Sequence, residues 1–210
     1  MEVKTTNRLF KGTYQYKAVL VCPGAQHFRS GDMDSTLESL KKVILTTDLK
    51  PVSWRNVHIK TQDDLDYAFK LQKVLKKFTA IEIRVESPWI SVYSNDKSQI
   101  DALVKIDKDR VKYISVPPNN SQLATGTVIM PKTDYDFRIT LGKTVNNHTT
   151  FVEWAEKNSK IKLTKSSVKD LNKDRSWGGT HFYVTGDNNL LMAKMHLGGC
   201  IAKVERIIKA

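Results

Sequence analysis

Two segments far apart in the chain share one residue pattern, and this internal match constrains the fold more than any other feature. Residues 14–20 (YQYKAVL) align without gaps with residues 135–141 (YDFRITL). Each copy has tyrosine first, an aromatic residue third, a basic residue fourth and leucine last. An amphipathic segment that starts with Ser or Thr follows each copy. Because a repeated pattern indicates a repeated structural unit, we expect two copies of one strand–helix unit.

A second match covers the ends of the two units. Residues 92–96 (VYSND) align with residues 183–187 (YVTGD), and the register continues to Val116 and Ile207. The offset is 121 residues for the first match and 91 for the second, so the first unit is expected to hold about 30 additional residues, placed around 63–86. The alignment also predicts that Asp96 and Asp187 occupy equivalent positions, each between a strand and a helix.

Hydrophobic periodicity predicts alternating strands and helices in both units. In the first unit it predicts strands at 16–22, 57–60, 81–86, 89–94 and 111–116 and helices at 36–45, 63–77 and 99–106. In the second unit it predicts strands at 136–141, 160–164, 181–185 and 201–208 and helices at 149–157, 166–172 and 189–197. This order is typical of an α+β protein with two diverged ferredoxin-like (βαββαβ-type) units in tandem, the first with an extra helix and hairpin strand.

The boundary between the units is predicted from a Pro-rich segment. Pro117 and Pro118, followed by two asparagines and a serine, cannot continue a strand or a helix. We therefore expect unit 1 at residues 1–118, a linker or loop at 119–134 and unit 2 at 135–210. The alternative is a long surface loop inside one continuous domain.

The chain has the composition of a globular protein and lacks the signals of membrane insertion or secretion. Its longest apolar runs fall well short of the roughly 18 residues that cross a bilayer, and charges occupy the start of the chain, where a signal peptide would be apolar. We expect a cytoplasmic protein with no membrane partner, or one in the host cytoplasm if the chain is viral. Cys22 and Cys200 stand alone in apolar contexts, which predicts buried side chains and not a disulfide framework.

Motifs for catalysis, metal binding or cofactor binding are not recognisable in the sequence. None of the five histidines has a metal-binding spacing, and neither a phosphate-binding nor a dinucleotide-binding glycine motif occurs. The loop at 24–32 contains His27 and Arg29 between glycines; it either cradles a phosphate or simply connects a strand to a helix. Paired aspartates are better explained as helix caps than as Mg²⁺ ligands. We therefore predict no metal and no cofactor, and we favour a protein without catalytic activity.

Net positive charge is the largest deviation in composition. The chain carries 34 Lys and Arg against 22 Asp and Glu, a formal charge of +12, which favours polyanionic partners. Scattered lysines can also reflect AT-biased codon usage, but residues 157–177 hold seven basic residues against two acids. The predicted nucleic-acid-binding residues are Lys157, Lys160, Lys162, Lys165, Lys169, Lys173, Arg175 and Trp177, together with Lys73, Lys76, Lys77 and Arg29.

Aromatic residues on the predicted strands give a second, weaker signal. A sheet covered by helices on one face leaves its other face open, where aromatic side chains can stack on bases beside basic groups. The candidates are Tyr14, Tyr16, Lys17, Arg84, Trp89, Tyr93, Tyr135, Phe137, Arg138, Phe182 and Tyr183. Strand alternation places Tyr14 and Tyr16 on the face opposite Lys17, and many strand aromatics belong to cores.

Two functions are consistent with these features. The first is a non-catalytic nucleic-acid-binding protein, for RNA or DNA, in which electrostatics supply most of the affinity and sequence specificity is weak. The alternative is a structural or assembly protein, of the kind that viruses and phages encode, whose duplicated unit mediates homo-oligomer formation.

Overall fold

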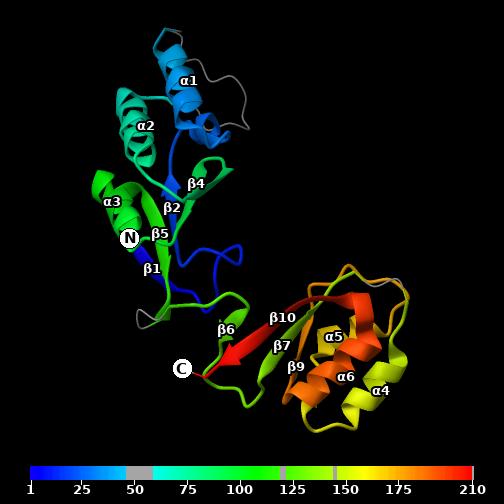
Figure 1. Ribbon diagram of the computed structural model, residues 1–210. Coiled ribbons are helices and arrows are strands. Elements are labelled where there is room, and N and C mark those ends of the chain that lie inside the picture. Colours follow the sequence, from blue (N-terminus) through cyan, green and yellow to red (C-terminus); the bar gives the residue numbers. More distant parts are fainter. Residues whose placement is uncertain (46–58, 119–121, 144–145, 210) are drawn as a thin grey trace. The chain divides into compact units, whose positions relative to one another are not determined.

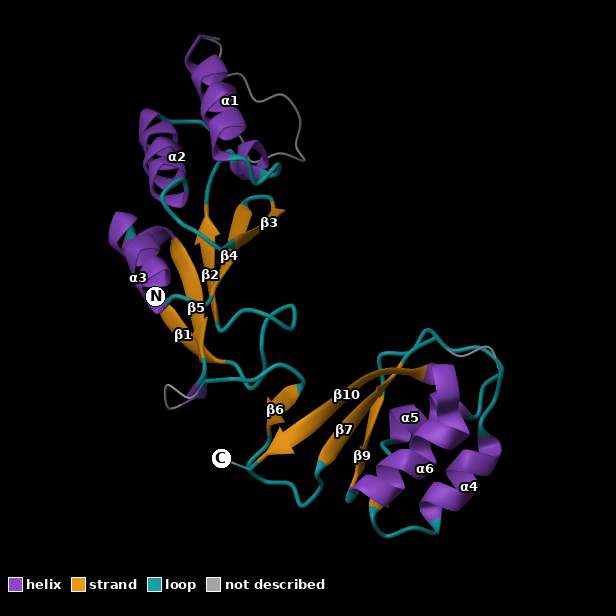
Figure 2. Cartoon of the chain, in the orientation of Figure 1, coloured by secondary structure: helices purple, strands orange, loops and turns teal. Residues whose placement is uncertain are grey.

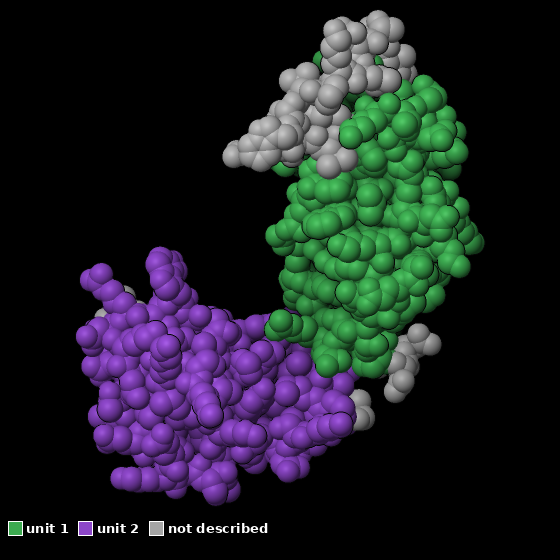
Figure 3. All heavy atoms as spheres, turned by 180° about the vertical axis from the view of Figure 1, so that it is seen from behind, with its two compact units in different colours: residues 1–123 green, residues 124–210 purple. Residues whose placement is uncertain are grey.

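The protein folds into two compact units, Met1–Leu123 and Ala124–Ala210, drawn in two colours in Figure 3. The computed structural model describes residues 1–45, 59–118, 122–143 and 146–209. The elements of each unit are labelled in Figure 1 and coloured by type in Figure 2. Each unit is α+β, with a five-stranded mixed sheet.

Unit 1 is built on a sheet with the strand order β1-β5-β2-β4-β3. Strand β1 runs parallel to β5, and the other neighbours are antiparallel. The elements are β1 (Glu2–Thr5), β2 (Tyr16–Val21), η1 (Ala25–Phe28), α1 (Met33–Leu45), α2 (Gln62–Leu75), β3 (Glu82–Glu86), β4 (Trp89–Ser94), α3 (Lys97–Ile106), η2 (Lys108–Arg110) and β5 (Val111–Val116).

Unit 2 is built on a sheet with the strand order β6-β10-β7-β9-β8. Strand β6 runs parallel to β10, and the other neighbours are antiparallel. The elements are β6 (Thr127–Ile129), β7 (Phe137–Leu141), α4 (Thr149–Glu156), β8 (Ile161–Lys162), α5 (Lys165–Leu171), β9 (His181–Val184), α6 (Asp187–Leu197), η4 (Gly198–Cys200) and β10 (Ile201–Ile208).

Each unit has its own hydrophobic core between its sheet and its helices. In unit 1, Leu40 of α1, Leu71 of α2 and Leu103 of α3 belong to one buried cluster with Ala18 and Leu20 of β2. Full burial of such a side chain contributes about 1.5–3 kcal/mol. Ala18 and Leu20 are two residues apart and so point to the same side of β2, where they meet the buried leucines of the three helices.

The core of unit 2 is more aromatic. Phe151 of α4 and Phe182 of β9 are both fully buried, with ring centroids 5.5 Å apart. Ile139 of β7, Leu171 of α5 and Ala193 of α6 belong to the same cluster. The three helices lie together on one face of this sheet in Figure 2.

The two sheets also agree in register. Lys17 of β2 lies opposite Tyr93 of β4, and Arg138 of β7 lies opposite Tyr183 of β9. Lys17 and Arg138 are 121 residues apart, which is the offset of the first sequence match. Their partners Tyr93 and Tyr183 therefore occupy corresponding positions in the two sheets, and these tyrosines are 90 residues apart. The offset of 91 taken from sequence is therefore wrong by one residue, because it pairs Val92 with Tyr183.

A shared irregularity strengthens this correspondence. Where β2 pairs with β5, the register skips Lys112, and where β7 pairs with β10 it skips Ala202. These two residues again differ by 90. An extra residue in one strand bends the strand and increases its local twist, so both sheets are distorted at the same place.

The strands and helices predicted from periodicity are confirmed to within a few residues, apart from 57–60. Residues 57 and 58 lie outside the described residues, and Ile59 and Lys60 are not in a strand. Strands β1 and β6 were not predicted, and β6 lies within the predicted linker 119–134. Both strands have only three or four residues, too few to show an apolar alternation.

The expected extra hairpin strand in unit 1 is wrong. Strands β3 and β8 occupy the same edge of their sheets, and within the described residues each unit has five strands and three α-helices. The units differ instead in where the helices lie. Two helices, α1 and α2, precede β3, whereas α4 precedes β8 and α5 follows it.

Asp96 and Asp187 each lie at the start of a helix that follows a strand, as predicted, but they do not occupy equivalent positions. Asp96 is the N-cap of α3 and accepts a hydrogen bond from the Ser98 N–H at 2.8 Å. Asp187 is the first residue of α6, whose N-cap is Gly186. The difference follows from the corrected offset of 90.

Candidate nucleic-acid interface

Each sheet has a face opposite its core, here called the outer face. Because side chains alternate along a strand, Ala18 and Leu20 point to the core of unit 1 while Lys17 points to the outer face. In unit 2, Ile139 belongs to the core and Arg138 to the outer face. The aromatic candidates divide in the same way. Tyr16, Phe137 and Phe182 pack in or against the cores, whereas Tyr14, Tyr93, Tyr135 and Tyr183 are associated with the outer faces.

On the outer face of unit 1, Lys17 is surrounded by aromatic rings. Its Nζ lies 5.5 Å from the ring centroids of Tyr93 and Tyr113 and 5.9 Å from that of Phe10. It also donates a hydrogen bond to the Tyr113 hydroxyl at 3.2 Å. The expectation that Tyr14 and Tyr16 lie on the face opposite Lys17 is confirmed for Tyr16, which packs against the core, and is wrong for Tyr14. Tyr14 precedes β2, so strand alternation does not apply to it, and its ring packs on Tyr93 of the outer face.

The aromatic face of unit 1 is covered by its own chain. Phe10 and Tyr14 form a β-bridge, and their rings lie 5.9 Å and 6.1 Å from the ring of Tyr93. Lys11 adds a cation 4.9 Å from the same ring. Tyr93 is consequently only 5% exposed.

The outer face of unit 2 has a charged network in place of these rings. Glu205 of β10 is 0% exposed; one carboxylate oxygen accepts from Lys203 Nζ at 2.6 Å, and the other lies 3.7 Å from Arg138 Nη1. Arg138 Nη2 lies 3.3 Å from His181 Nδ1, and His181 Nε2 lies 3.1 Å from the Tyr183 hydroxyl. Arg138 and Tyr183 were among the predicted aromatic and basic candidates, whereas His181, Lys203 and Glu205 were not, because local sequence does not show that β10 and β9 flank β7.

The basic segment 157–177 runs along one edge of unit 2. Lys157 caps the C-terminus of α4, Lys162 lies in the edge strand β8, and Lys165 and Lys169 lie on α5. All seven predicted cations are exposed. Within the described ranges, Lys173 alone among them has an ion pair, a long one of 3.9 Å to Asp170. The two acids of the segment also accept hydrogen bonds from neutral side chains. Asp170 accepts one from the Thr180 hydroxyl, and Asp174 accepts one from the Asn147 amide.

Trp177 lies in the loop between α5 and β9 and is 86% exposed, with Lys143 Nζ 5.0 Å from its ring centroid. The loop is held by the glycines that follow. Gly178, at a φ of +75°, packs so closely on Gly142 that an added Cβ would lie 2.3 Å from the Gly142 carbonyl oxygen. The Gly179 N–H donates to the Leu141 carbonyl at 2.7 Å. Only glycine permits this approach, so the backbone fixes the loop while the indole stays in solvent.

The other four predicted site residues belong to unit 1. Lys73 lies in α2, Lys76 and Lys77 follow it, and Arg29 follows η1; all four are exposed. Lys76 is engaged within the protein, because its Nζ forms an ion pair with Asp34 of α1 at 2.5 Å. The structure therefore places these residues on a different unit from the segment 157–177.

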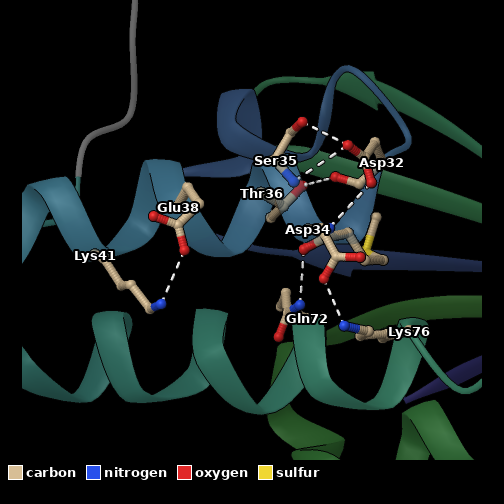
Figure 4. A network of polar contacts seen from close by, with 9 residues as sticks. Asp32, Asp34, Ser35, Thr36, Glu38, Lys41, Gln72 and Lys76 are labelled. Carbon is tan, nitrogen blue, oxygen red and sulfur yellow. Dashed lines mark hydrogen bonds and ion pairs between the residues drawn. The ribbon is translucent and has the colours of Figure 1, made fainter.

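Figure 4 shows the polar network around Lys76. Asp32 accepts hydrogen bonds from the Asp34 and Ser35 N–H groups and so caps α1. Gln72 of α2 is buried and donates to the Met33 carbonyl at 2.7 Å. The hydrogen bonds from Ser35 and Asp34 hold the pKa of Asp32 below its usual value. The predicted capping role is confirmed for Asp32, whereas Asp34 pairs with Lys76.

The loop at 24–32 connects β2 to α1, as one of the two interpretations of its sequence predicted. Residues Ala25–Phe28 form a 3-10 turn, and His27 Nδ1 lies 2.6 Å from Ser39 Oγ of α1. Gly24 has a φ of +85° and packs against Ile59, with no room for a Cβ. Glycine is therefore required here by the turn and by the close packing.

A polar cavity of about 260 Å³ lies in unit 1 beside α2 and η2. Arg110 is one of the residues that line the cavity. Its Nη1 donates a hydrogen bond to Asp64 at 2.9 Å, and its guanidinium lies 4.7 Å from the ring of Tyr67. Burial by itself would raise the pKa of Asp64, but hydrogen bonds from Arg110 and Thr61 outweigh it and lower that pKa. Burial raises the pKa of Tyr67.

In the described part of the chain, no group of three or more His, Cys, Asp or Glu side chains is arranged to hold a metal ion. None of the helices in those same ranges has the length and apolar character that a membrane crossing requires. Among known proteins, no protein-family model, curated protein or solved structure matches the chain.

Proposed function

We propose that the protein binds nucleic acid without catalysing a reaction and that the segment 157–177 of unit 2 is its main phosphate-contacting surface. One observation carries this proposal: seven exposed cations follow one another along an edge of unit 2, and a single long ion pair engages them among the described residues. Cations without an internal partner are available to displace counterions from phosphates, which is the main source of affinity in weakly specific binding.

The exposed indole of Trp177 supports the same surface. It lies at the end of the basic segment, beside Lys143, on a loop whose backbone is fixed by Gly178 and Gly179. An aromatic ring beside cations is the combination that contacts both bases and phosphates. Unit 1 contributes less, since Lys76 is paired with Asp34.

The two units are diverged copies of one ferredoxin-like unit in this proposal. Strands β2, β3, β4 and β5 with their connecting helices follow the order βαββαβ, with β1 added at the edge, and unit 2 has the same strand order. Supporting observations are the common register of Lys17 and Arg138 and the matching register shifts at Lys112 and Ala202. A duplicated unit explains why two sheets with few sequence identities share these irregularities.

Charge reversal at the basic surface tests the function. The variant Lys157→Glu/Lys165→Glu/Lys169→Glu and a control variant, Lys97→Glu/Lys105→Glu/Lys108→Glu, change net charge equally, and all six lysines are exposed. Fluorescence anisotropy with labelled single-stranded and duplex probes would be measured from about 50 to about 300 mM salt. We expect the first variant to lose about tenfold or more in affinity and to have a shallower salt dependence, and the control to lose much less.

Two results would contradict the proposal. Wild-type protein that bound neither probe at low salt would exclude the function. Equal losses in both variants would show that net charge, and not the surface 157–177, determines binding.

A specific observation favours assembly as the second candidate. Helix α6 exposes Leu191, Met192 and Met195, of which Leu191 is 58% and Met195 71% exposed. Apolar side chains grouped on one helix are typical of contact surfaces. If this face mediates self-association, sedimentation velocity will show a concentration-dependent oligomer that Leu191→Glu/Met195→Glu dissolves. A monomer at all concentrations would exclude it.

A further inference from the structure

The equivalent tyrosines Tyr93 and Tyr183 have different surroundings. In unit 1, ten residues (6–15) connect the first two strands, and this segment places Phe10 against Tyr93. In unit 2 the corresponding connection has seven residues (130–136). It supplies Tyr135, which packs on Tyr183 at 5.8 Å just as Tyr14 packs on Tyr93. The shorter connection contains no counterpart of Phe10.

As a result, Tyr183 is partly exposed while Tyr93 is buried. In the described part of the chain, the rings packed against Tyr183 are those of Tyr135 and His181, the latter edge-on at 5.4 Å. Unit 1 thus shows what this position accommodates: a planar ring, held between a tyrosine and a cation. In the described part of unit 2 no such ring covers Tyr183, so the position is open to a ring from another molecule.

Buried polar atoms beside Tyr183 indicate what else that molecule carries. Arg138 Nε and Glu205 Oε2 are both buried, and neither has a hydrogen-bond partner in the described structure, although Glu205 Oε2 lies 3.7 Å from Arg138 Nη1 in an ion pair. The first is a donor and the second an acceptor. A buried polar group without a hydrogen-bond partner is destabilising. A nucleobase offers both donors and acceptors along its edge, and so matches this pair.

The charges on this face complete the description of the ligand. Arg138, Lys203 and Lys162 outnumber Glu205, and Lys162 lies directly opposite Tyr183 in the register of β8 and β9. Lys162 also belongs to the basic segment 157–177, so the outer face and the phosphate-contacting edge are continuous at β8. A ring that stacks on Tyr183 would have its phosphate beside Lys162.

We propose that the outer face of unit 2, around Tyr183, binds an unpaired nucleobase, so that the protein prefers single-stranded to double-stranded nucleic acid. The equivalent face of unit 1 is closed by Phe10 and does not bind. This proposal rests on the proposed nucleic-acid-binding function, because a base reaches the outer face only if the strand is held along β8. Bases inside a duplex are stacked on each other and cannot occupy the site.

The variant Tyr183→Leu tests this proposal, because leucine preserves apolar contact and removes the stacking ring. We expect about a tenfold loss of affinity for a single-stranded probe of about 20 nucleotides, little change for the matching duplex and an unchanged salt dependence. Tyr93→Leu is the matched control and should leave affinity within about twofold. Circular dichroism would confirm that each variant is folded, and Tyr135→Leu replaces Tyr183→Leu if the latter is not.

A second measurement locates the base directly. A single-stranded probe that contains 5-iodouracil should crosslink to Tyr183 or Tyr135, identified by peptide mass spectrometry. Crosslinks at Tyr93, or a Tyr93→Leu variant that loses as much affinity as Tyr183→Leu, would overturn the assignment to unit 2. If Tyr183→Leu and Tyr135→Leu bind like wild type while the lysine variant at 157, 165 and 169 does not, the base site is wrong and the proposed function stands. If wild type binds neither probe, both are wrong.

Discussion

Lys17 and Arg138 occupy the same register position in their two sheets, opposite Tyr93 and Tyr183, yet different interactions hold the two cations. Lys17 interacts with three aromatic rings and donates to a tyrosine hydroxyl. Arg138 faces the buried carboxylate of Glu205. Two cations at corresponding register positions are thus held by different interactions in the two units.

We predict that Arg138→Leu destabilises its unit more than Lys17→Leu destabilises the other. Among the described residues, loss of Arg138 leaves Lys203 as the one cation paired with the buried Glu205, at a cost of about 2–4 kcal/mol. Leucine at position 17 keeps contact with the rings and should cost about 1 kcal/mol. Urea unfolding followed by circular dichroism measures both. The double variant Arg138→Leu/Glu205→Leu should recover most of the loss, and equal losses in the two single variants would contradict the buried-charge explanation.

The helix caps at Asp96 and Asp187 give a second comparison. Asp96→Ala removes the acceptor for the Ser98 N–H and should lower the free energy of unfolding by about 0.5–2 kcal/mol. Asp187 is the first residue of α6, and among the described residues its side chain accepts no capping hydrogen bond, so Asp187→Ala should cost only the helix-dipole contribution of about 0.3–1 kcal/mol. Thermal or urea unfolding would rank the two. A larger loss for Asp187→Ala would refute the one-residue offset.

Stability at low pH should depend on the Asp64–Arg110 pair. The folded-state pKa of Asp64 is lowered, since its hydrogen bonds outweigh the effect of burial. The stabilisation is therefore fully present above the unfolded-state pKa of about 3.9 and is lost as the pH falls through the lower folded-state value. Asp64→Asn should be less stable than wild type at neutral pH, and the difference should shrink between about pH 5 and pH 2. A difference that is independent of pH over this range would exclude the ionised pair.

The two cysteines should differ in reactivity. Burial raises the pKa of Cys22 to about 12, and the side chain is 0% exposed. Cys200 is partly exposed, with His148 Nε2 3.1 Å from its sulfur. Because the thiolate is the reactive form, iodoacetamide at about pH 8 should alkylate Cys200 in the native protein and Cys22 only after denaturation. Peptide mass spectrometry reads out both sites, and rapid native labelling of Cys22 would show that its strand end opens.

Much of the secondary structure could be predicted from local sequence. The alternation of residues in β2 and β7 and the helical spacing in α2 and α4 each reflect which side of one element is buried, and that information is contained within a few neighbouring residues. The internal match between 14–20 and 135–141 likewise predicted two strands that now share one register position. The basic segment 157–177 was also predicted from local sequence, because charge is a property of each residue and Lys and Arg side chains are mostly exposed in folded proteins.

What local sequence could not supply was the neighbour of each strand. The outer faces gain Tyr113, His181, Lys203 and Glu205 because β5, β9 and β10 lie beside β2 and β7, and strand pairing is decided by the whole chain. Phe10 joins the outer face of unit 1 because the segment between β1 and β2 folds back onto Tyr93. Only the tertiary structure therefore decided that Lys17 meets aromatic rings, that Arg138 meets a buried carboxylate, and that Phe10 covers one tyrosine and leaves its counterpart partly exposed. The physical reason is that alternation fixes the face on which a side chain lies, whereas its partners on that face come from strands far away in sequence.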